Sequence, residues 1–170
     1  MKKTFIFLTL LSSMFMSFAQ TNAKSIPLTD LKTMDGKTFN SSKFSNEGKP
    51  MVIIVWESFC RPCLSYFDAI NENFDDWKKE TGVKIIIISI DPPKSSSNVA
   101  PLVKSKGWDF ESYLDVNRDF KTAMGVTSCP HSFLVDGKGS VVWEKIGYSN
   151  GTESDLFELI KKLTKGQSIK

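Results

Sequence analysis

Residues 51–63, MVIIVWESFCRPC, carry the strongest structural signal in the chain. The first six, Met51 to Trp56, form a continuous apolar run that is rich in β-branched residues. A strand that is covered on both faces of a mixed or parallel sheet has this composition. The cysteines Cys60 and Cys63 stand three positions apart where this run has ended. We therefore expect them at the junction between a buried strand and a helix.

The helical period begins at the second cysteine and predicts one helix over residues 63–79. Its apolar positions share one face: Cys63, Tyr66, Phe67, Ile70, Phe74 and Trp77. Gly82 is expected to end the helix. A helix start offers unpaired N–H groups and partial positive charge, which stabilise a nearby thiolate. Pro62 suits the opening turn, where its missing N–H is not needed.

The rest of the chain continues the alternation of strands and helices. We expect a hairpin at 28–40 around Asp35-Gly36, a helical turn within 41–48, a buried strand at 83–90, helices at 95–106 and 117–124, a short strand within 108–114, a hairpin of 132–135 with 141–145, and a final amphipathic helix. This order predicts one α/β domain with a mixed central sheet flanked by helices. It includes an N-terminal hairpin and an inserted helix after the second buried strand.

The first 19 residues have the pattern of a secretory signal peptide. Lys2 and Lys3 precede an apolar run from Phe5 to Phe18, and Ser17-Phe18-Ala19 supplies small residues at a cleavage site. The run has 14 positions and includes four hydroxyl residues, whereas a membrane-spanning helix needs roughly 20 mostly apolar residues. We expect cleavage after Ala19, a single domain over residues 20–170, and export. An uncleaved anchor is the alternative.

Charge and cysteine content narrow the function classes. The net charge of +3 falls to +1 when the leader and its two lysines are removed, so nothing favours nucleic acid or an anionic membrane as a partner. Membrane contact is expected only through the leader. Three cysteines do not make a framework of paired disulfides, so the Cys60 and Cys63 pair indicates redox chemistry or metal binding. No cofactor is expected, and a monomer is the default.

The junction resembles the thioredoxin superfamily, in particular its exported TlpA/ResA-like branch of thiol–disulfide oxidoreductases. The resemblance covers about residues 25–165. It rests on Trp56 four positions before the first cysteine, on the Cys-x-Pro-Cys core, and on Gly125-Val126-Thr127-Ser128-Cys129-Pro130 followed by Phe133-Leu134-Val135-Asp136 and Gly139.

The resemblance implies roles for individual residues. Cys60 matches the exposed attacking cysteine, and Cys63 matches the resolving cysteine that releases the mixed disulfide. Pro130 matches the family's cis-proline beside the active disulfide. The implied partners are protein thiols and disulfides, with an upstream redox partner that recharges the pair. Reduction of disulfides in exported proteins, such as one between the haem-attaching cysteines of apocytochrome c, and general thiol homeostasis are the implied functions, and the periplasm is the implied compartment.

Two positions depart from the relatives. Thioredoxin has a buried Asp where this chain has Ile54, and ResA-like members often have Glu where it has Tyr66. The proton acceptor for Cys63 is therefore open, and Glu57 is a candidate, with a solvent-facing strand-end residue as the alternative. If the charge of Arg61 reaches Cys60, it stabilises the thiolate and makes the disulfide more oxidising. Otherwise Arg61 is an ordinary solvated side chain.

Cys129 directly precedes the expected cis-proline and should therefore lie near the active pair. It is either an inert apolar side chain, an alternative disulfide partner, or a third soft metal ligand. His131, the only histidine, is expected at the surface or hydrogen-bonded. Two other functions remain open. One is a copper-binding module of Cys60, Cys63 and Cys129. The other is a thiol peroxidase, although Glu57 occupies the threonine position of the peroxiredoxin pattern.

Overall fold

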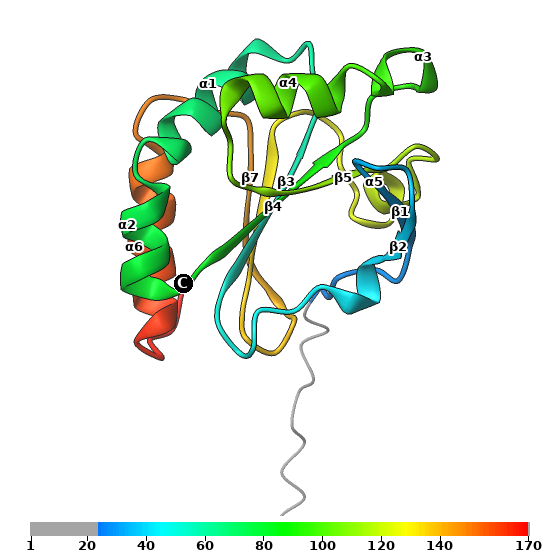
Figure 1. The fold of residues 1–170 in the computed structure, drawn as a ribbon. Helices are drawn as coiled ribbons and strands as arrows, with labels where there is room; N and C mark the ends of the chain where they lie inside the picture. Colours follow the sequence, from blue (N-terminus) through cyan, green and yellow to red (C-terminus); the bar gives the residue numbers. More distant parts are fainter. Residues whose placement is uncertain (1–23, 170) are drawn as a thin grey trace, which may run out of the picture.

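The computed structural model describes residues 24–169, which form a seven-stranded mixed sheet with helices on both faces (Figure 1). In chain order the elements are β1 (Asp30–Thr33), β2 (Thr38–Asn40), the 3-10 helix η1 (Ser41–Lys43), β3 (Met51–Trp56), α1 (Arg61–Asn71), α2 (Phe74–Thr81), β4 (Lys84–Ser89), α3 (Pro93–Ser96), α4 (Val99–Lys106), β5 (Glu111–Leu114), α5 (Asp119–Ala123), β6 (His131–Val135), β7 (Val141–Ile146) and α6 (Thr152–Thr164). The sheet order is β2-β1-β5-β4-β3-β6-β7. This architecture confirms the predicted α/β class. The proposed signal peptide lies outside the described residues.

The two buried apolar runs form the centre of the sheet. Strands β3 and β4 pair in parallel from Met51↔Lys84 to Trp56↔Ser89. β4 and β5 are also parallel, whereas β6 pairs antiparallel with β3 and the outer strands pair antiparallel with their neighbours. Because β3 and β4 run in parallel, the loops that follow their carboxyl ends lie next to each other. These are the loops that build the site.

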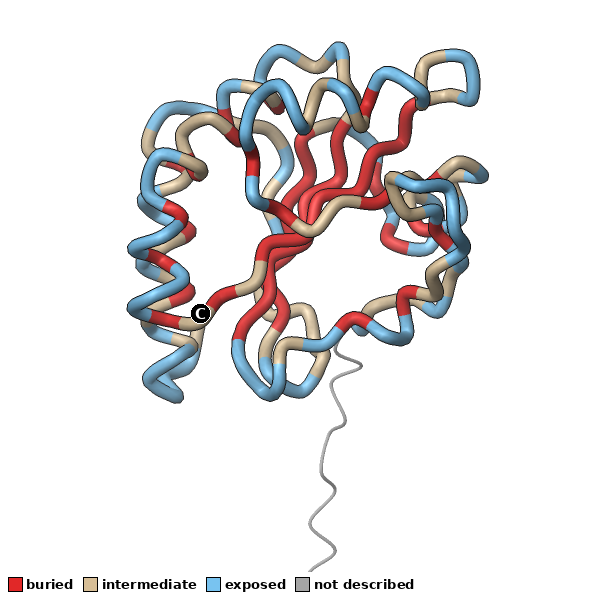
Figure 2. The backbone as a smooth tube through the Cα atoms, viewed as in Figure 1, coloured by how far each residue is buried: buried red, intermediate tan, exposed pale blue. Residues whose placement is uncertain are grey.

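The hydrophobic core lies in two layers, one on each face of the sheet, and Figure 2 shows the strands buried in the middle. Along β3, Ile54 and Trp56 pack toward α1, α2, α4 and α6, while Ile53 and Val55 pack toward α5 and the N-terminal hairpin. Successive side chains of a strand point to opposite faces, so a strand covered on both faces must be apolar throughout. Each such side chain contributes about 1.5–3 kcal/mol on burial.

Two predicted helices are interrupted. The segment expected as one helix over 63–79 consists of α1 and α2, separated by Glu72 and Asn73. The backbone of Asn73 leaves the helical region, with φ −122 and ψ 4, and α2 then begins at Phe74. The new direction lets Trp77 stack on Phe157 of α6, with ring centroids 4.7 Å apart. The expected helix at 95–106 is likewise divided into α3 and α4.

The predicted turns are confirmed. Gly82 ends α2 in the left-handed conformation, with φ 66, and its N–H donates to the Lys78 carbonyl at 2.8 Å. β1 and β2 form the hairpin around Asp35-Gly36. β6 and β7 form the hairpin whose connection begins at Asp136. Within residues 24–169, no helix combines the length and apolar character that crossing a bilayer requires.

Candidate active site

Cys60 and Cys63 are joined by a disulfide at the start of α1, with Sγ atoms 2.07 Å apart. The two cysteines differ in accessibility: Cys63 is fully buried, whereas Cys60 is partly exposed. A partner thiol can therefore reach Cys60 and not Cys63. This asymmetry is compatible with the roles of attacking and resolving cysteine that the resemblance implies.

The helix start holds Cys60 where a negative charge is stabilised. Cys60 is the N-cap residue of α1, and its Sγ accepts the N–H of Cys63 at 3.3 Å. Pro62 lies in the first turn, as predicted. The same N–H and the partial charge of the helix terminus would stabilise the Cys60 thiolate that reduction releases. The thiolate is the nucleophile of disulfide exchange.

The Cys129–Pro130 peptide bond is cis, which agrees with the prediction from resemblance. Pro130 is buried at the start of β6, and its carbonyl accepts the N–H of Gly147 at 2.7 Å. Cys129 is the free cysteine of the described chain and is half-buried. The structure thus brings the segment before β6 to the same end of the sheet as α1.

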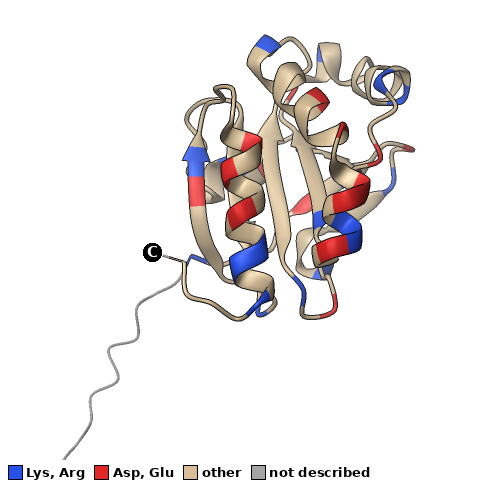
Figure 3. Ribbon diagram, turned by 90° about the vertical axis from the view of Figure 1, so that its left-hand side faces the viewer, with Lys and Arg blue, Asp and Glu red and all other residues tan. Residues whose placement is uncertain are grey.

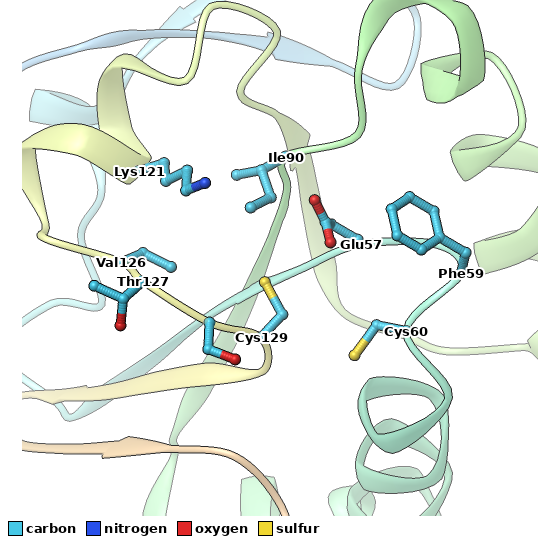
Figure 4. Close-up of a pocket in the computed structure, with 9 residues that line it drawn as sticks. Glu57, Phe59, Cys60, Ile90, Lys121, Val126, Thr127 and Cys129 are labelled. Atoms are coloured by element: carbon cyan, nitrogen blue, oxygen red, sulfur yellow. The ribbon is translucent and has the colours of Figure 1, made fainter.

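A pocket of about 350 Å³ lies between these two segments, and Figure 4 shows the side chains around it. Its lining includes Glu57, Phe59, Cys60, Lys121, Ser128 and Cys129. Phe59 is 64% exposed, so its ring is accessible to a partner. The pocket therefore offers a partner an apolar contact directly beside the accessible sulfur of the pair.

Glu57 faces this pocket from the end of β3. Its Oε1 lies 3.8 Å from Nη2 of Arg118, which also donates to the Ile90 carbonyl at 3.2 Å. The Glu57 side chain is 23% exposed, so it is neither a freely solvated surface group nor a buried one. Its place in the pocket with Cys60 and Cys129 is compatible with proton uptake during exchange.

The loop before Cys60 is anchored by Asp91, which directly follows the buried strand expected at 83–90 and is not among the predicted site residues. The Asp91 carboxyl group is buried and accepts four hydrogen bonds. Their donors are Ser58 N at 2.8 Å, Ser58 Oγ at 2.6 Å, Ser89 Oγ at 2.7 Å and Ser95 Oγ at 3.2 Å. The sequence contains one signal for this role, which is the position of Asp91. A polar residue directly after one buried parallel strand lies beside the loop that follows the neighbouring parallel strand.

The other predicted site residues have simpler surroundings. Trp56 is fully buried and packs edge-on against Phe67 and Trp108, so its observed contacts are those of a core residue. Arg61 is exposed and forms no ion pair within the described residues. Burial raises the pKa of the Tyr66 phenol to about 12, so this hydroxyl stays protonated at neutral pH and cannot accept the Cys63 proton.

Cys129 is held as a neutral thiol. Burial raises its pKa to about 11, and the nearby charge of Glu57 acts in the same direction. In residues 24–169, no three His, Cys, Asp or Glu side chains are placed to share a metal ion. The copper-module interpretation therefore gains no support from the geometry.

The expectation for His131 is wrong. Its side chain is 3% exposed, and neither ring nitrogen has a hydrogen-bond partner. The ring stacks on Phe133, with centroids 4.2 Å apart, and Nε2 lies 3.9 Å from Oε2 of Glu144, which also binds Lys24. The reason is topological: His131 belongs to β6, which lies between β3 and β7 and is covered on both faces.

We predict that His131 makes the protein less stable in mild acid. Burial lowers the pKa of His131, so below the unfolded value of about 6.5 the unfolded chain binds the proton more readily. The stability is complete above pH 6.5 and falls as the pH decreases, by at most about 1.4 kcal/mol per unit. Urea unfolding at pH 7, 6 and 5 measures this loss. The His131→Phe variant should lack it, and equal slopes in both proteins would contradict the prediction.

The fold and the site together define a thioredoxin-like protein with a disulfide-bonded Cys-x-Pro-Cys pair. The Redoxin family profile matches residues 20–160, and the chain belongs to that family. It is 31% identical over 142 residues to the thiol-disulfide oxidoreductase ResA of Bacillus thuringiensis subsp. konkukian, covering 84% of this chain and 76% of that protein. It is 27% identical over 129 residues to the thiol:disulfide interchange protein DsbE of Haemophilus influenzae, covering 75% and 67%.

Among solved structures, the chain is similar to a thioredoxin-like protein from Porphyromonas gingivalis. The two share 41% identity at a TM-score of 0.75, over 84% of this chain and 94% of the other. These similarities confirm the thioredoxin-like fold and the resemblance to the TlpA/ResA-like branch. They also identify the enzyme class, so the chain is a thiol–disulfide oxidoreductase.

Proposed function

We propose that this enzyme is exported and exchanges disulfides with thiols of other exported proteins through Cys60 and Cys63. The observation that carries the proposal is the asymmetric disulfide, whose accessible sulfur lies beside a pocket and an exposed aromatic ring. The leader pattern of residues 1–19 supports export, with the periplasm as the proposed compartment. We propose that the enzyme acts as a monomer and that an upstream redox partner reduces the Cys60–Cys63 disulfide after each cycle.

The proposed direction is reduction of disulfides in exported proteins to thiols. The likeness to the TlpA/ResA-like branch makes the haem-attaching cysteines of apocytochrome c one candidate substrate, and a wider role in thiol homeostasis is the other. Phe59 and the pocket beside Cys60 would receive the segment that flanks the substrate cysteine, and Pro130 would lie next to it. Exchange proceeds by attack of the Cys60 thiolate on a substrate disulfide, followed by attack of Cys63 on the Cys60 sulfur.

A redox titration tests this proposal. The chain is equilibrated in thiol–disulfide buffers, and free thiols are counted by mass spectrometry. We expect a reversible two-electron transition of Cys60 and Cys63 between roughly −270 and −120 mV, the range of active oxidoreductases. A pair that stays oxidised below about −300 mV would be a structural disulfide, and the proposal would then be wrong.

Within this function we propose that Glu57 accepts the thiol proton that exchange releases. The Glu57→Gln variant should exchange disulfides roughly 10- to 100-fold more slowly, since a positioned base contributes at least this much. Its redox potential should be preserved, because the amide removes the base and leaves the pair in place. Stopped-flow exchange with a disulfide-containing peptide gives the rate. A Glu57→Gln variant with the wild-type rate would contradict the role, and Glu47→Gln serves as an exposed control.

A further inference from the structure

The pocket beside the active pair contains a second thiol that the exchange cycle does not use. Cys60 and Cys129 both line this pocket, and Figure 4 shows them on opposite walls with Glu57 above Cys129. The pocket is therefore bordered by the accessible sulfur of the pair, by a free thiol and by a carboxylate. These three groups come from α1, from the segment before β6 and from the end of β3.

Cys129 is fixed at this place by its surroundings. Its side chain packs against the core layers on both faces of the sheet, and the next residue is the buried Pro130. A half-buried thiol that is anchored in this way loses little freedom when it reacts across the pocket. Burial and Glu57 keep the thiol protonated, with a pKa of about 11, so it does not react indiscriminately with solutes.

We propose that Cys129 is a second resolving thiol for Cys60. This inference depends on the proposed function, since it requires mixed disulfides at Cys60. The sulfur of Cys129 attacks the Cys60 sulfur of a Cys60–substrate disulfide, which forms a Cys60–Cys129 disulfide and expels the substrate thiolate. The Cys129 thiol loses its proton to water before the attack, and the leaving thiolate takes a proton from water. No external oxidant or reductant is needed, because one disulfide replaces another.

In the complete enzyme Cys63 closes the cycle. Its thiolate attacks Cys60 in the Cys60–Cys129 disulfide, so that the Cys60–Cys63 disulfide forms and Cys129 regains its proton. Cys129 thus provides a second route for resolving a mixed disulfide that Cys63 has not resolved. At pH 7 only about one thiol in 10⁴ with a pKa of 11 is ionised, which slows the attack of Cys129 by this factor. Oriented groups reach effective molarities of about 10⁵ M or more, and this gain in the rate of attack is larger than the loss.

The test uses the full chain with Cys63→Ser, in which the usual resolving thiol is absent. The reduced variant is reacted with a peptide that carries one activated disulfide, and the Cys60–peptide adduct is followed by intact mass. We expect this adduct to disappear and a Cys60–Cys129 disulfide to appear in the peptide map. The adduct should last at least about ten times longer in Cys63→Ser/Cys129→Ser, since intramolecular attack is lost.

Two further measurements distinguish a chemical role of Cys129 from a structural one. Release in Cys63→Ser should accelerate about tenfold per pH unit between pH 7 and 9, because the thiolate fraction of Cys129 rises by this factor. Cys63→Ser/Ser128→Ala changes the same wall of the pocket and keeps the thiol, so it should still release the peptide. Circular dichroism and urea unfolding establish that each variant is folded.

The outcomes distinguish this inference from the function on which it depends. If the adduct forms and is equally long-lived with and without Cys129, the second resolving role is wrong and exchange at Cys60 stands. If no adduct forms in Cys63→Ser/Cys129→Ser, then Cys60 does not take part in exchange and the proposed function fails as well. A peptide map with Cys129 still free after release would also overturn the inference.

Discussion

Replacing Asp91 with alanine should lower the free energy of unfolding by about 3 kcal/mol and slow disulfide exchange at Cys60. The Asp91 carboxyl group is 2% exposed and accepts hydrogen bonds from Ser58 and Ser89 within 2.8 Å. Alanine leaves these donors without a partner, and an unsatisfied buried donor costs about 1–3 kcal/mol. Urea unfolding of the variant and of the wild type measures the difference.

The effect on exchange follows from the position of Ser58. Both its N–H and its hydroxyl bind Asp91, so this one carboxyl group fixes the loop two residues before Cys60. A displacement of about 1 Å at a reacting group can cost 10²-fold in rate, and we expect a loss of at least tenfold. Ser95→Ala removes only one of the four hydrogen bonds to Asp91, the one at 3.2 Å, and is the matched control. A stable Asp91→Ala variant with normal exchange would show that the network does not position the site.

The features that sequence predicted are those that depend on neighbouring residues. The run from Met51 to Trp56 predicted a buried central strand, and the switch to helical period predicted the junction at Cys60 and Cys63. Each of these signals comes from fewer than 20 consecutive positions, where periodicity and capping act directly. Recognition of Pro130 needed the resemblance, since neither spacing nor composition indicates a cis peptide bond.

The features that sequence missed depend on pairing between distant strands. Asp91 binds Ser58 across 33 positions, and this contact exists because β3 and β4 lie in parallel with Trp56 opposite Ser89. His131 is buried because β6 lies inside the sheet, which no local pattern around a single histidine could reveal. The division between α1 and α2 likewise serves a contact with α6, more than 70 residues further along the chain.

At two positions where relatives have an acidic residue this chain has none, and the structure shows which acidic groups lie near the pair instead. Positions 54 and 66 hold Ile54 and Tyr66, and neither side chain can act as a base near neutral pH. Two acidic groups follow the carboxyl ends of the central strands: Glu57, after β3, lines the pocket with Cys60, and Asp91, after β4, binds Ser58. Glu57 is partly exposed and has its Oε1 3.8 Å from Nη2 of Arg118, whereas Asp91 is buried and bound by four donors. We therefore propose that Glu57 transfers the proton and that Asp91 positions the loop before Cys60.

Replacing Cys60 with serine should abolish disulfide exchange while leaving the fold intact. A serine oxygen cannot form a disulfide, and its hydroxyl is almost never ionised near neutral pH, so we expect a loss of about 10³-fold or more. The helix should not suffer, because Cys60 is the N-cap of α1 and its Sγ accepts the Cys63 N–H at 3.3 Å. Serine is among the preferred N-cap residues and can accept the same N–H.

The reference for stability is the reduced wild type, since the variant cannot form the Cys60–Cys63 disulfide. Against this reference, Cys60→Ser should unfold at the same urea concentration or a slightly higher one, and its far-UV circular dichroism should be unchanged. Exchange with a disulfide-containing peptide should be undetectable in the same preparation. Cys60→Ser would then lose activity but keep its stability, whereas Asp91→Ala would lose both activity and stability. Residual exchange in Cys60→Ser would mean that Cys129 or Cys63 attacks substrate directly, and the assignment of the accessible sulfur as nucleophile would be wrong.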